Sequence, residues 1–378
     1  MKKKNKILKI AMFGHKHIPS REGGVEIVVG ELSTRMAAMG HKVTCYNRSG
    51  HFAGEATENS LKNGEYKGVN VRSVPTLDFK GLAAVSSSFF AALRCSFSRA
   101  DVVHIHAEGP AFMSFLPRLF GKKVIVTVHG LDWQREKWKS GFGAKYIKLG
   151  EKSAVKFAHE IIVLSRGEKE YFKNNYGRDV VRIPNGVDRP KLQDPELITE
   201  KYGLNKDGYI LFLGRLVPEK GLHLLIEAFK NTNTDKKLVI AGGASDTNDY
   251  VEEIKKFAKD DERIIFTGFV EGKMMAELYS NAYVYTLPSS LEGMPLSLLE
   301  AMSYSNACLV SDIPECAEVV EDKGEVVHIE KSEDLKKALQ KLCDNPEIVQ
   351  KYKSESSDYI CQKYSWDDVV KKTLELYK

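Results

Sequence analysis

The chain has 378 residues, of which 43% are hydrophobic and 28% charged, a composition typical of a soluble globular protein long enough for two domains. Its net charge of +5 is too small to predict a nucleic-acid partner, although it permits a basic face toward phosphates or an anionic membrane. The six cysteines form no CxxC pair and no run of about 18 apolar residues occurs, so we expect reduced thiols and no transmembrane helix.

The N-terminal half alternates apolar runs with helical patterns. Its first apolar run, residues 7–13, is short and lacks a small-residue cleavage pattern, so we expect a buried strand rather than a signal peptide. Further strands are predicted at 42–46, 69–74, 101–106, 123–129, 160–164 and 180–184. This alternation predicts an α/β fold with a doubly wound parallel sheet, whose site lies at the carboxyl ends of the strands.

Two glycines, Gly23 and Gly24, follow the first strand and precede a helical pattern that runs through Ala38 to a stop at Gly40. A strand, a glycine-bearing loop and a helix can bring backbone N–H groups close to a phosphate or a sugar. A plain turn is an equally good interpretation of the glycine pair by itself.

Histidines stand at the ends of two predicted strands. His104 and His106 could suggest a metal pair, but no carboxylate or third imidazole accompanies them in the pattern, so we predict no metal site. His129 ends the strand at 123–129 just before Gly130, where it is either a site residue or a hydrogen-bonded structural histidine.

The second half begins after a charged, proline-containing segment, 189–207, which we interpret as a linker. Strands are predicted at 209–213, 237–241, 263–268, 283–287, 308–312 and 325–328, and a last helix runs to Lys378. The turn after the first of these strands carries Arg215 and Lys220. A guanidinium fork and an ammonium point charge suit the phosphates of a leaving nucleoside diphosphate, especially in a dry site.

The stretch 289–303 places Glu292 and Glu300 eight positions apart, with Pro295 expected in the first turn of a helix. Eight residues of helical rise span roughly 12 Å, which is about the distance between a sugar and a ribose joined by a diphosphate. Carboxylates accept strongly from sugar hydroxyls, and a helix start favours phosphate. An amphipathic helix with two solvated glutamates is the simpler alternative.

Five motifs follow one another in order: GGVE at 23–26, VHG at 128–130, NGVD at 185–188, GRLVPEKG at 214–221 and EGMPLSLLE at 292–300. Together they resemble the retaining glycosyltransferases of family 4, which have the GT-B fold of two Rossmann-like domains facing each other across a cleft. The resemblance spans nearly the whole chain. It implies an acceptor-side domain at 1–187, a nucleotide-sugar domain at 188–362, and a C-terminal helix at 363–378 packed back onto the first domain.

The resemblance also implies roles. Glu292 would hold the donor sugar, Glu300 the ribose, and Arg215 and Lys220 the leaving diphosphate. The remaining donor contacts would come from Gly23, Gly24, Val270, Gly293, Met294, Pro295 and Leu296. His129 would lie beside the reaction centre, and His17, Asp132 and Asn185 on the acceptor side. The implied reaction is a same-face displacement in which the departing phosphate takes the acceptor proton, without cofactor, metal or protein nucleophile.

The resulting prediction is a cytoplasmic, retaining hexosyltransferase-type enzyme acting on a saccharide or lipid-linked saccharide in cell-surface polysaccharide or glycolipid assembly. Residues 81–100 and the basic stretch 133–156 could contact an anionic membrane, which would place the protein peripherally at its inner face. A core helix and a solvated helix face are the alternatives for these segments.

Other functions stay open. A nucleotide-sugar epimerase could use the same fold, as could a sugar phosphorylase, although we find no cofactor lysine for the latter. A non-catalytic nucleotide-sugar-binding membrane scaffold is a further alternative. No G-x-G-x-x-G follows either first strand, which disfavours a dinucleotide-dependent oxidoreductase.

Overall fold

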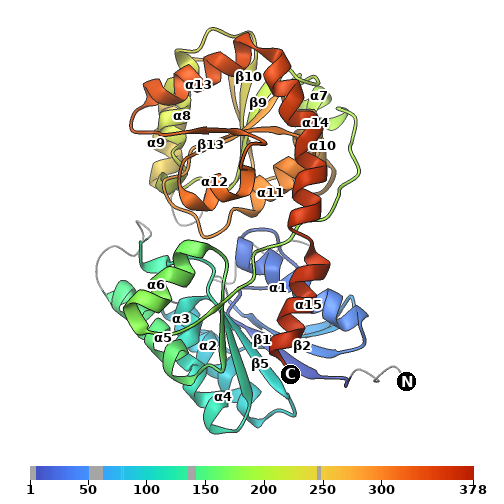
Figure 1. The fold of residues 1–378 in the computed structure, drawn as a ribbon, viewed down its shortest axis with the longest axis vertical. Helices are drawn as coiled ribbons and strands as arrows, with labels where there is room; N and C mark the ends of the chain where they lie inside the picture. Colours follow the sequence, from blue (N-terminus) through green and yellow to red (C-terminus); the bar gives the residue numbers. More distant parts are fainter. Residues whose placement is uncertain (1–5, 51–62, 78, 80, 135–141, 245–247) are drawn as a thin grey trace. The chain divides into compact units, whose positions relative to one another are not determined.

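A computed structural model describes residues 6–50, 63–77, 79, 81–134, 142–244 and 248–378 (Figure 1). The chain forms two compact units: Met1–Asn185 with Trp366–Lys378, and Gly186–Ser365. Each unit is an α/β layer structure with its own sheet.

The first unit has an eight-stranded sheet in the order β3-β4-β2-β1-β5-β6-β7-β8. The strands are β1 Lys9–Phe13, β2 Lys42–Arg48, β3 Asn63–Tyr66, β4 Val69–Val74, β5 Val102–His106, β6 Lys123–Thr127, β7 Glu160–Val163 and β8 Val181–Arg182. Neighbouring strands are parallel except for the β3–β4 hairpin. The central strands are apolar because helices cover both faces of the sheet.

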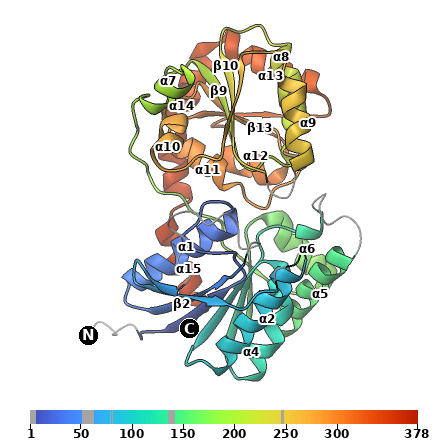
Figure 2. The ribbon, with the colours of Figure 1, turned by 180° about the vertical axis from the view of Figure 1, so that it is seen from behind.

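The helices of this unit lie in two layers. They are α1 Gly24–Ala38, α2 Leu82–Phe97, α3 Glu108–Ala111, α4 Phe115–Leu119, α5 Phe142–Phe157, α6 Arg166–Tyr176 and α15 Trp366–Leu376, with short 3₁₀ turns η2 Phe112–Ser114 and η3 Asp132–Gln134. Helices α1 and α15 cover one side of the sheet and α2 to α5 the other (Figures 1 and 2). Helix α2 packs inward through small residues, including Ala91 and Ala92, which lets it lie close to the strands.

The second unit has a six-stranded parallel sheet in the order β11-β10-β9-β12-β13-β14. Its strands are β9 Tyr209–Leu213, β10 Lys237–Ala241, β11 Ile264–Gly268, β12 Val284–Leu287, β13 Ala307–Ser311 and β14 Glu325–Val327. Its helices are α7 Leu197–Tyr202, α8 Leu222–Lys230, α9 Asn248–Ala258, α10 Gly272–Asn281, α11 Leu296–Ser303, α12 Pro314–Val320, α13 Ser332–Asp344 and α14 Pro346–Lys363, with the 3₁₀ turn η5 Pro218–Lys220. Helices α8, α9 and α13 lie on one side, and α7, α10 and α14 on the other (Figures 1 and 2).

The predicted strands are confirmed to within one or two residues at most ends, with two differences in the first unit. Strand β6 ends at Thr127, so His129 lies in the following loop rather than on the strand. The short strand β3 was not predicted, although Lys67 and Gly68, both at positive φ, form the two-residue turn that joins it to β4.

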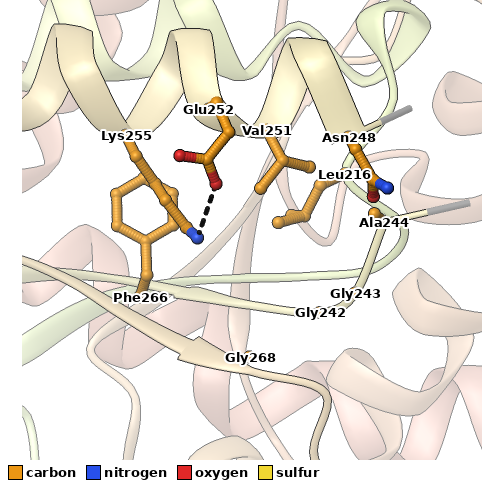
Figure 3. A pocket seen from close by; sticks show the side chains of 10 residues that line it. All are labelled: Leu216, Gly242, Gly243, Ala244, Asn248, Val251, Glu252, Lys255, Phe266 and Gly268. Atoms are coloured by element: carbon orange, nitrogen blue, oxygen red, sulfur yellow. Dashed lines mark hydrogen bonds and ion pairs between the residues drawn. The ribbon is translucent and has the colours of Figure 1, made fainter.

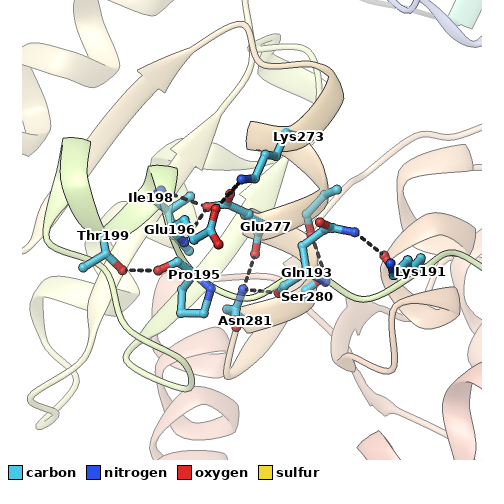
Figure 4. A network of polar contacts seen from close by, with 11 residues as sticks. Lys191, Gln193, Pro195, Glu196, Ile198, Thr199, Lys273, Glu277, Ser280 and Asn281 are labelled. Carbon is cyan, nitrogen blue, oxygen red and sulfur yellow. Dashed lines mark hydrogen bonds and ion pairs between the residues drawn. The ribbon is translucent and has the colours of Figure 1, made fainter.

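The interpretation of 189–207 as a linker was wrong, because this segment includes α7 and is bound to α10 (Figure 4). The buried carboxylate of Glu277 accepts from the backbone N–H groups of Glu196 and Ile198, each at 3.0 Å. The Ser280 hydroxyl accepts from the N–H of Gln193 at 3.0 Å. The charges and prolines of this segment did not indicate that its backbone binds Glu277, because that buried carboxylate lies more than seventy positions further along the chain.

The C-terminal helix α15 belongs to the first unit, whereas α14, which precedes it in the chain, belongs to the second. Arg35 of α1 forms a 3.0 Å ion pair with Asp367. The buried hydroxyl of Tyr377 lies 2.6 Å from Nδ1 of His104 on β5. The end of the chain thus reaches the centre of the first sheet.

Candidate active site

In the second unit the strand order reverses between the neighbours β9 and β12. A crevice forms outside the carboxyl ends of parallel strands at such a reversal, because successive connections leave to opposite sides. The connection after β9 carries Arg215 and Lys220, and the connection after β12 carries Glu292. The fold therefore places three of the predicted donor-binding side chains at one edge of this sheet.

Lys220 and Glu292 are in direct contact. The Lys220 ammonium forms an ion pair with Oε1 of Glu292, and each side chain is only 10% exposed. The Ser289 hydroxyl donates to the same carboxylate oxygen at 2.7 Å. One buried carboxylate is thereby held by a cation and a hydroxyl from two different connections.

Gly221 makes this approach possible. Its φ is +69°, and a Cβ atom on this residue would lie 2.3 Å from the carbonyl oxygen of Pro288. The Ser290 N–H donates to the Glu219 carbonyl at 2.9 Å, which ties the same two connections together. Only glycine tolerates both the left-handed backbone and the short distance, so the last residue of the GRLVPEKG motif has a structural cause.

A pocket of about 280 Å³ opens beside these connections (Figure 3). It is lined by Leu216, Gly242, Gly243, Ala244, Asn248, Val251, Glu252, Lys255, Phe266 and Gly268. Backbone bonds join its rim, from Leu216 N to Gly243 O at 3.0 Å and from Gly242 N to Gly268 O at 2.9 Å. Val270, predicted to contact the nucleobase, lies two residues beyond this rim and is not part of the lining.

The stretch from Glu292 to Glu300 is not one helix. Helix α11 begins at Leu296, and Pro295 is its N-cap, with ψ at 103°. The predictions that Pro295 lies in the first helical turn and that helical rise separates the two glutamates were therefore wrong. Glu292 is fixed in the preceding loop by its bonds to Lys220 and Ser289 instead.

Glu300 lies in the middle of α11, on a half-buried face. Its Oε2 is 3.4 Å from the hydroxyl of Tyr279, whose ring stacks on Tyr304 with centroids 5.3 Å apart. The Tyr285 hydroxyl bonds to Oγ of Ser297 at 2.9 Å. The buried side chains of Tyr279 and Tyr285 thus hold α11 in place through Glu300 and Ser297. Gly293, Met294, Pro295 and Leu296 form the stretch from the Glu292 loop into its first turn.

In the first unit, the loop after β1 is built around the buried carboxylate of Glu26. Its Oε1 accepts from the Lys16 N–H at 2.8 Å, and a Cβ on Gly23 would lie 2.4 Å from its Oε2. Gly23 is the N-cap of α1, which starts at Gly24. His15 bonds to Asn47 at 2.9 Å, and burial lowers its pKa to about 4. His17, in the same loop, is also buried.

His129 follows β6 and meets a second histidine. Its Nε2 lies 3.1 Å from Nδ1 of His106, at the end of β5. The ring of His106 packs on His104, with centroids 4.1 Å apart. Because strands β5 and β6 are adjacent in the sheet, the structure brings all three predicted histidines into one row, in which His104 and His106 are buried and His129 is half-buried.

Asp132 and Asn185 complete the predicted acceptor-side residues. The Asp132 N–H donates to Oε2 of Glu108 at 2.7 Å, and Asn185 is buried at the end of the first unit.

Two buried glutamates, Glu108 and Glu151, were given no role in the sequence analysis. Glu108, at the start of α3, is fully buried, and burial raises its pKa well above 4.5, helped by the charge of Asp132 and by the Glu151 carboxyl. Glu151 of α5 accepts from the hydroxyls of Tyr171 at 3.0 Å and Tyr176 at 2.6 Å. The only local indication of a site was the position of Glu108 directly after β5, in the sequence His106-Ala107-Glu108. Glu151, Tyr171 and Tyr176 lie on helices that are distant in the sequence.

Within the described residues, no group of three or more His, Cys, Asp or Glu side chains is placed to hold a metal ion. The independence from metal and cofactor therefore stays a prediction. All six cysteines are free thiols. No helix in the described ranges combines the length and apolarity needed to cross a membrane.

Comparisons with known proteins identify the family. A sequence model of glycosyltransferase family 4 matches residues 22–190, and one of glycosyl transferases group 1 matches 194–372. Alpha-maltose-1-phosphate synthase of Mycolicibacterium smegmatis is 28% identical over 306 residues, which cover 74% of this chain and 79% of the relative.

Two further proteins are similar to this chain, one in sequence over part of its length and the other in fold over nearly all of it. An Escherichia coli protein, UDP-Gal:alpha-D-GlcNAc-diphosphoundecaprenol alpha-1,3-galactosyltransferase, is 30% identical over 56% of this chain and 58% of its own length. Sucrose-phosphate synthase of Thermosynechococcus elongatus shares the fold, with a TM-score of 0.83 and 20% identity over 98% of both chains. Two consecutive family matches, a common fold and the ordered site motifs agree: the chain belongs to the family-4 glycosyltransferases, with the GT-B fold.

Proposed function

We propose that this glycosyltransferase moves a hexose from a nucleotide sugar to a saccharide or lipid-linked saccharide with retention of anomeric configuration, in the assembly of cell-surface polysaccharide or glycolipid. The observation that carries the proposal is the buried Lys220–Glu292 pair at the β9–β12 reversal. A nucleotide-sugar donor agrees with the UDP-Gal and the diphosphoundecaprenol acceptor in the name of the E. coli relative.

The donor would extend along the edge of the second sheet. The pocket beyond β10 and β11 is apolar at Leu216, Val251 and Phe266 and rimmed by backbone, which suits a flat base. Glu300, on α11, would accept from the ribose hydroxyls, and Lys220 and Arg215 would face the diphosphate. Glu292 would then exchange part of its contact with Lys220 for hydroxyls of the sugar.

In the proposed displacement, the bond between the anomeric carbon and the diphosphate oxygen breaks on the face where the acceptor oxygen bonds. The acceptor proton passes to the departing diphosphate, so atoms and charge balance without a protein nucleophile. The protein contributes to this reaction electrostatically, because its fixed cations stabilise the negative charge that develops on the leaving group.

The test is a sugar-nucleotide screen by thermal shift, followed by turnover with a panel of saccharide and lipid-linked acceptors. Proton NMR of the first product, taken before any anomerisation, gives its configuration. An anomeric configuration opposite to that of the donor would reject retention. Formation of an isomeric sugar nucleotide with no acceptor present would instead support an epimerase.

We also propose a peripheral contact with anionic lipid through α5. Lys145, Lys148, Lys152 and Lys156 are exposed at helical spacing, so they form one basic face. Of the predicted basic stretch, residues 135–141 lie outside the described part, and Trp133 packs under Lys148 with the ammonium 4.1 Å from the ring. The lysines, rather than Trp133, are therefore the proposed contact.

The charge-reversal pair Lys152→Glu and Lys156→Glu should lower co-sedimentation with phosphatidylglycerol vesicles. The matched control reverses Lys337 and Lys341, which have the same spacing on α13 of the other unit. Equal vesicle binding by both variants and the wild type would remove the membrane part of the proposal and leave the transferase part intact.

A further inference from the structure

The three histidines His104, His106 and His129 differ in how many of their ring nitrogens are hydrogen-bonded, and this difference determines the tautomer of His129. His104 uses both ring nitrogens, with Nδ1 at 2.6 Å from the Tyr377 hydroxyl and Nε2 at 2.7 Å from Oγ1 of Thr127. His106 uses only Nδ1, which lies 3.1 Å from Nε2 of His129. The Nε2 atom of His106 is buried and has no protein partner among the described residues.

Both buried rings are neutral at ordinary pH. Burial lowers the pKa of His104 to about 3, and it lowers the pKa of His106 well below 6.5, with the neighbouring histidines adding to the effect. A neutral imidazole carries one N–H and one lone pair. Only one of the two facing nitrogens, Nδ1 of His106 or Nε2 of His129, therefore supplies the hydrogen of their bond.

The two arrangements differ at the far side of His106. If His129 donated, the single proton of His106 would sit on Nε2, as an N–H buried without an acceptor from the protein. If His106 donates from Nδ1, that buried atom holds only a lone pair. Orphaned buried N–H groups are rare in proteins and unsatisfied buried acceptors are less rare, so the arrangement in which His106 donates from Nδ1 is favoured.

We infer that His106 is a positioning residue that donates its Nδ1–H to Nε2 of His129, and so holds His129 in the tautomer that carries its proton on Nδ1. His129 then offers a hydrogen-bond donor, and its Nε2 lone pair is not available to take a proton. If Nε2 of His129 also took up a proton, its N–H would point at the Nδ1–H of His106. The two groups would repel each other unless the proton of His106 moved to its buried Nε2.

The inference rests on the proposed function for its chemical meaning. A histidine that donates from Nδ1 suits an oxygen of the donor sugar or of its diphosphate, which needs a donor. It does not suit a general base for the acceptor hydroxyl. The acceptor proton then has to leave with the diphosphate, as the same-face displacement requires, and His129 contributes by orientation and polarisation.

The experiment reads the tautomer directly. In protein labelled with ¹⁵N-histidine at pH 7.5, two-bond ¹H–¹⁵N spectra separate protonated from unprotonated ring nitrogens, and His129 is assigned by its missing signals in His129→Asn. We expect a protonated Nδ1 and an unprotonated Nε2 for His129. The reverse tautomer, a mixture of the two or a doubly protonated ring would overturn the inference.

Variants test the positioning role. His106→Asn keeps an amide N–H near the place of Nδ1 and should keep the tautomer and most of kcat. His106→Phe should mix the tautomers of His129 and lower kcat roughly tenfold or more with little change in KM. Tyr377→Phe removes a hydroxyl from the same row but leaves the His106–His129 bond, so it should leave the His129 signals unchanged.

These readouts separate the inference from the function on which it rests. The Nδ1–H tautomer in a protein that turns over no sugar nucleotide would reject the proposed function and support the geometry. An active enzyme with the reverse tautomer, or equal kcat in the Asn and Phe variants, would reject the positioning role alone. Should His106→Phe fail to fold, the wild-type spectrum still decides.

Discussion

Lys220 and Glu292 form a buried ion pair although they are 72 positions apart in the chain. One follows β9 and the other follows β12, and these strands are neighbours in the sheet. Each side chain is 10% exposed, so removing one partner leaves the other as a poorly solvated charge. The two residues should therefore behave as one functional unit.

The first prediction is a double-mutant cycle on this pair. Lys220→Met and Glu292→Gln keep the side-chain volume nearly constant and remove one charge each. We expect each single variant to lose roughly 10²-fold in turnover, because charge stabilisation of the leaving group is lost or misplaced. The double variant should lose much less than the product of the two, since each single change already disrupts both residues.

The cycle is checked by steady-state kinetics, with unfolding curves to show that the variants are folded. Lys341→Ala is the matched control, because it breaks an exposed ion pair with Glu325 in the same unit and should change turnover less than about twofold. Independent, multiplicative effects of Lys220 and Glu292 would contradict the shared role.

The second prediction concerns Arg215, which is half-buried on the connection after β9. Arg215→Ala should lower kcat by roughly 10²-fold or more, because a fixed cation facing the diphosphate is lost. Arg215→Lys should recover part of that loss, since an ammonium supplies charge but not the guanidinium fork. Near-normal kcat for the alanine variant, measured at saturating donor, would exclude the assigned role.

The third prediction separates binding from turnover at Glu300. Glu300→Ala should weaken donor affinity in calorimetry, because the ribose hydroxyls lose their acceptor, and it should lower kcat less than it weakens binding. Tyr279→Phe is the control, since it removes only the hydroxyl 3.4 Å from the Glu300 carboxylate. Unchanged donor affinity in Glu300→Ala would show that the ribose lies elsewhere.

The fourth prediction compares two glycines in the left-handed region. Gly221 has φ +69° and Gly203 φ +60°, but a Cβ would lie 2.3 Å from Pro288 O at Gly221 and 3.6 Å from the flexible end of Lys237 at Gly203. Gly203→Ala should cost about 1 kcal/mol in the free energy of unfolding, the strain of the backbone alone. Gly221→Ala should cost several times as much, because one connection must move away from the other.

Urea unfolding measures both costs, and the kinetics add a second readout. Moving the turn at Gly221 displaces Lys220 from Glu292, so this variant should lose activity as well as stability, whereas Gly203→Ala should be fully active. Similar stability losses in the two variants would mean that the approach to Pro288 is not tight in solution.

The fifth prediction is a pH dependence set by Glu108. Burial first, and then the charge of Asp132, raise its pKa well above 4.5 in the folded protein. The unfolded chain therefore releases this proton at lower pH than the native state, and the contribution of Glu108 to stability falls as pH rises above about 4.5. Glu108→Gln mimics the protonated form and should be at least as stable as the wild type near neutral pH.

The measurement is the urea midpoint of both proteins at pH 5 and pH 8. The advantage of Glu108→Gln over the wild type should grow by on the order of 1 kcal/mol between these values. A constant difference across this range, or a wild type favoured more at pH 8, would show that Glu108 is ionised in the native state.

Much of the fold follows from local sequence, because its causes are local. Apolar runs of four to seven residues separated by helical patterns lead to parallel strands, and all six strands of the second unit begin within one residue of their predicted starts. The motifs also indicated which connections carry Arg215, Lys220 and Glu292, since these follow strand ends directly. What was wrong was the geometry within a connection, where Pro295 caps the helix instead of lying inside it.

By itself, then, the sequence determined the two α/β repeats, the order of their strands along the chain and the residue types at the strand ends. The tertiary structure decided which of those ends become neighbours: Lys220 beside Glu292, His106 beside His129, and Glu108 beside Glu151. These pairings depend on strand order and on helices distant in sequence, and no local pattern encodes them. The reason is physical, because a buried charge or imidazole is stable only next to the partner that the whole fold supplies.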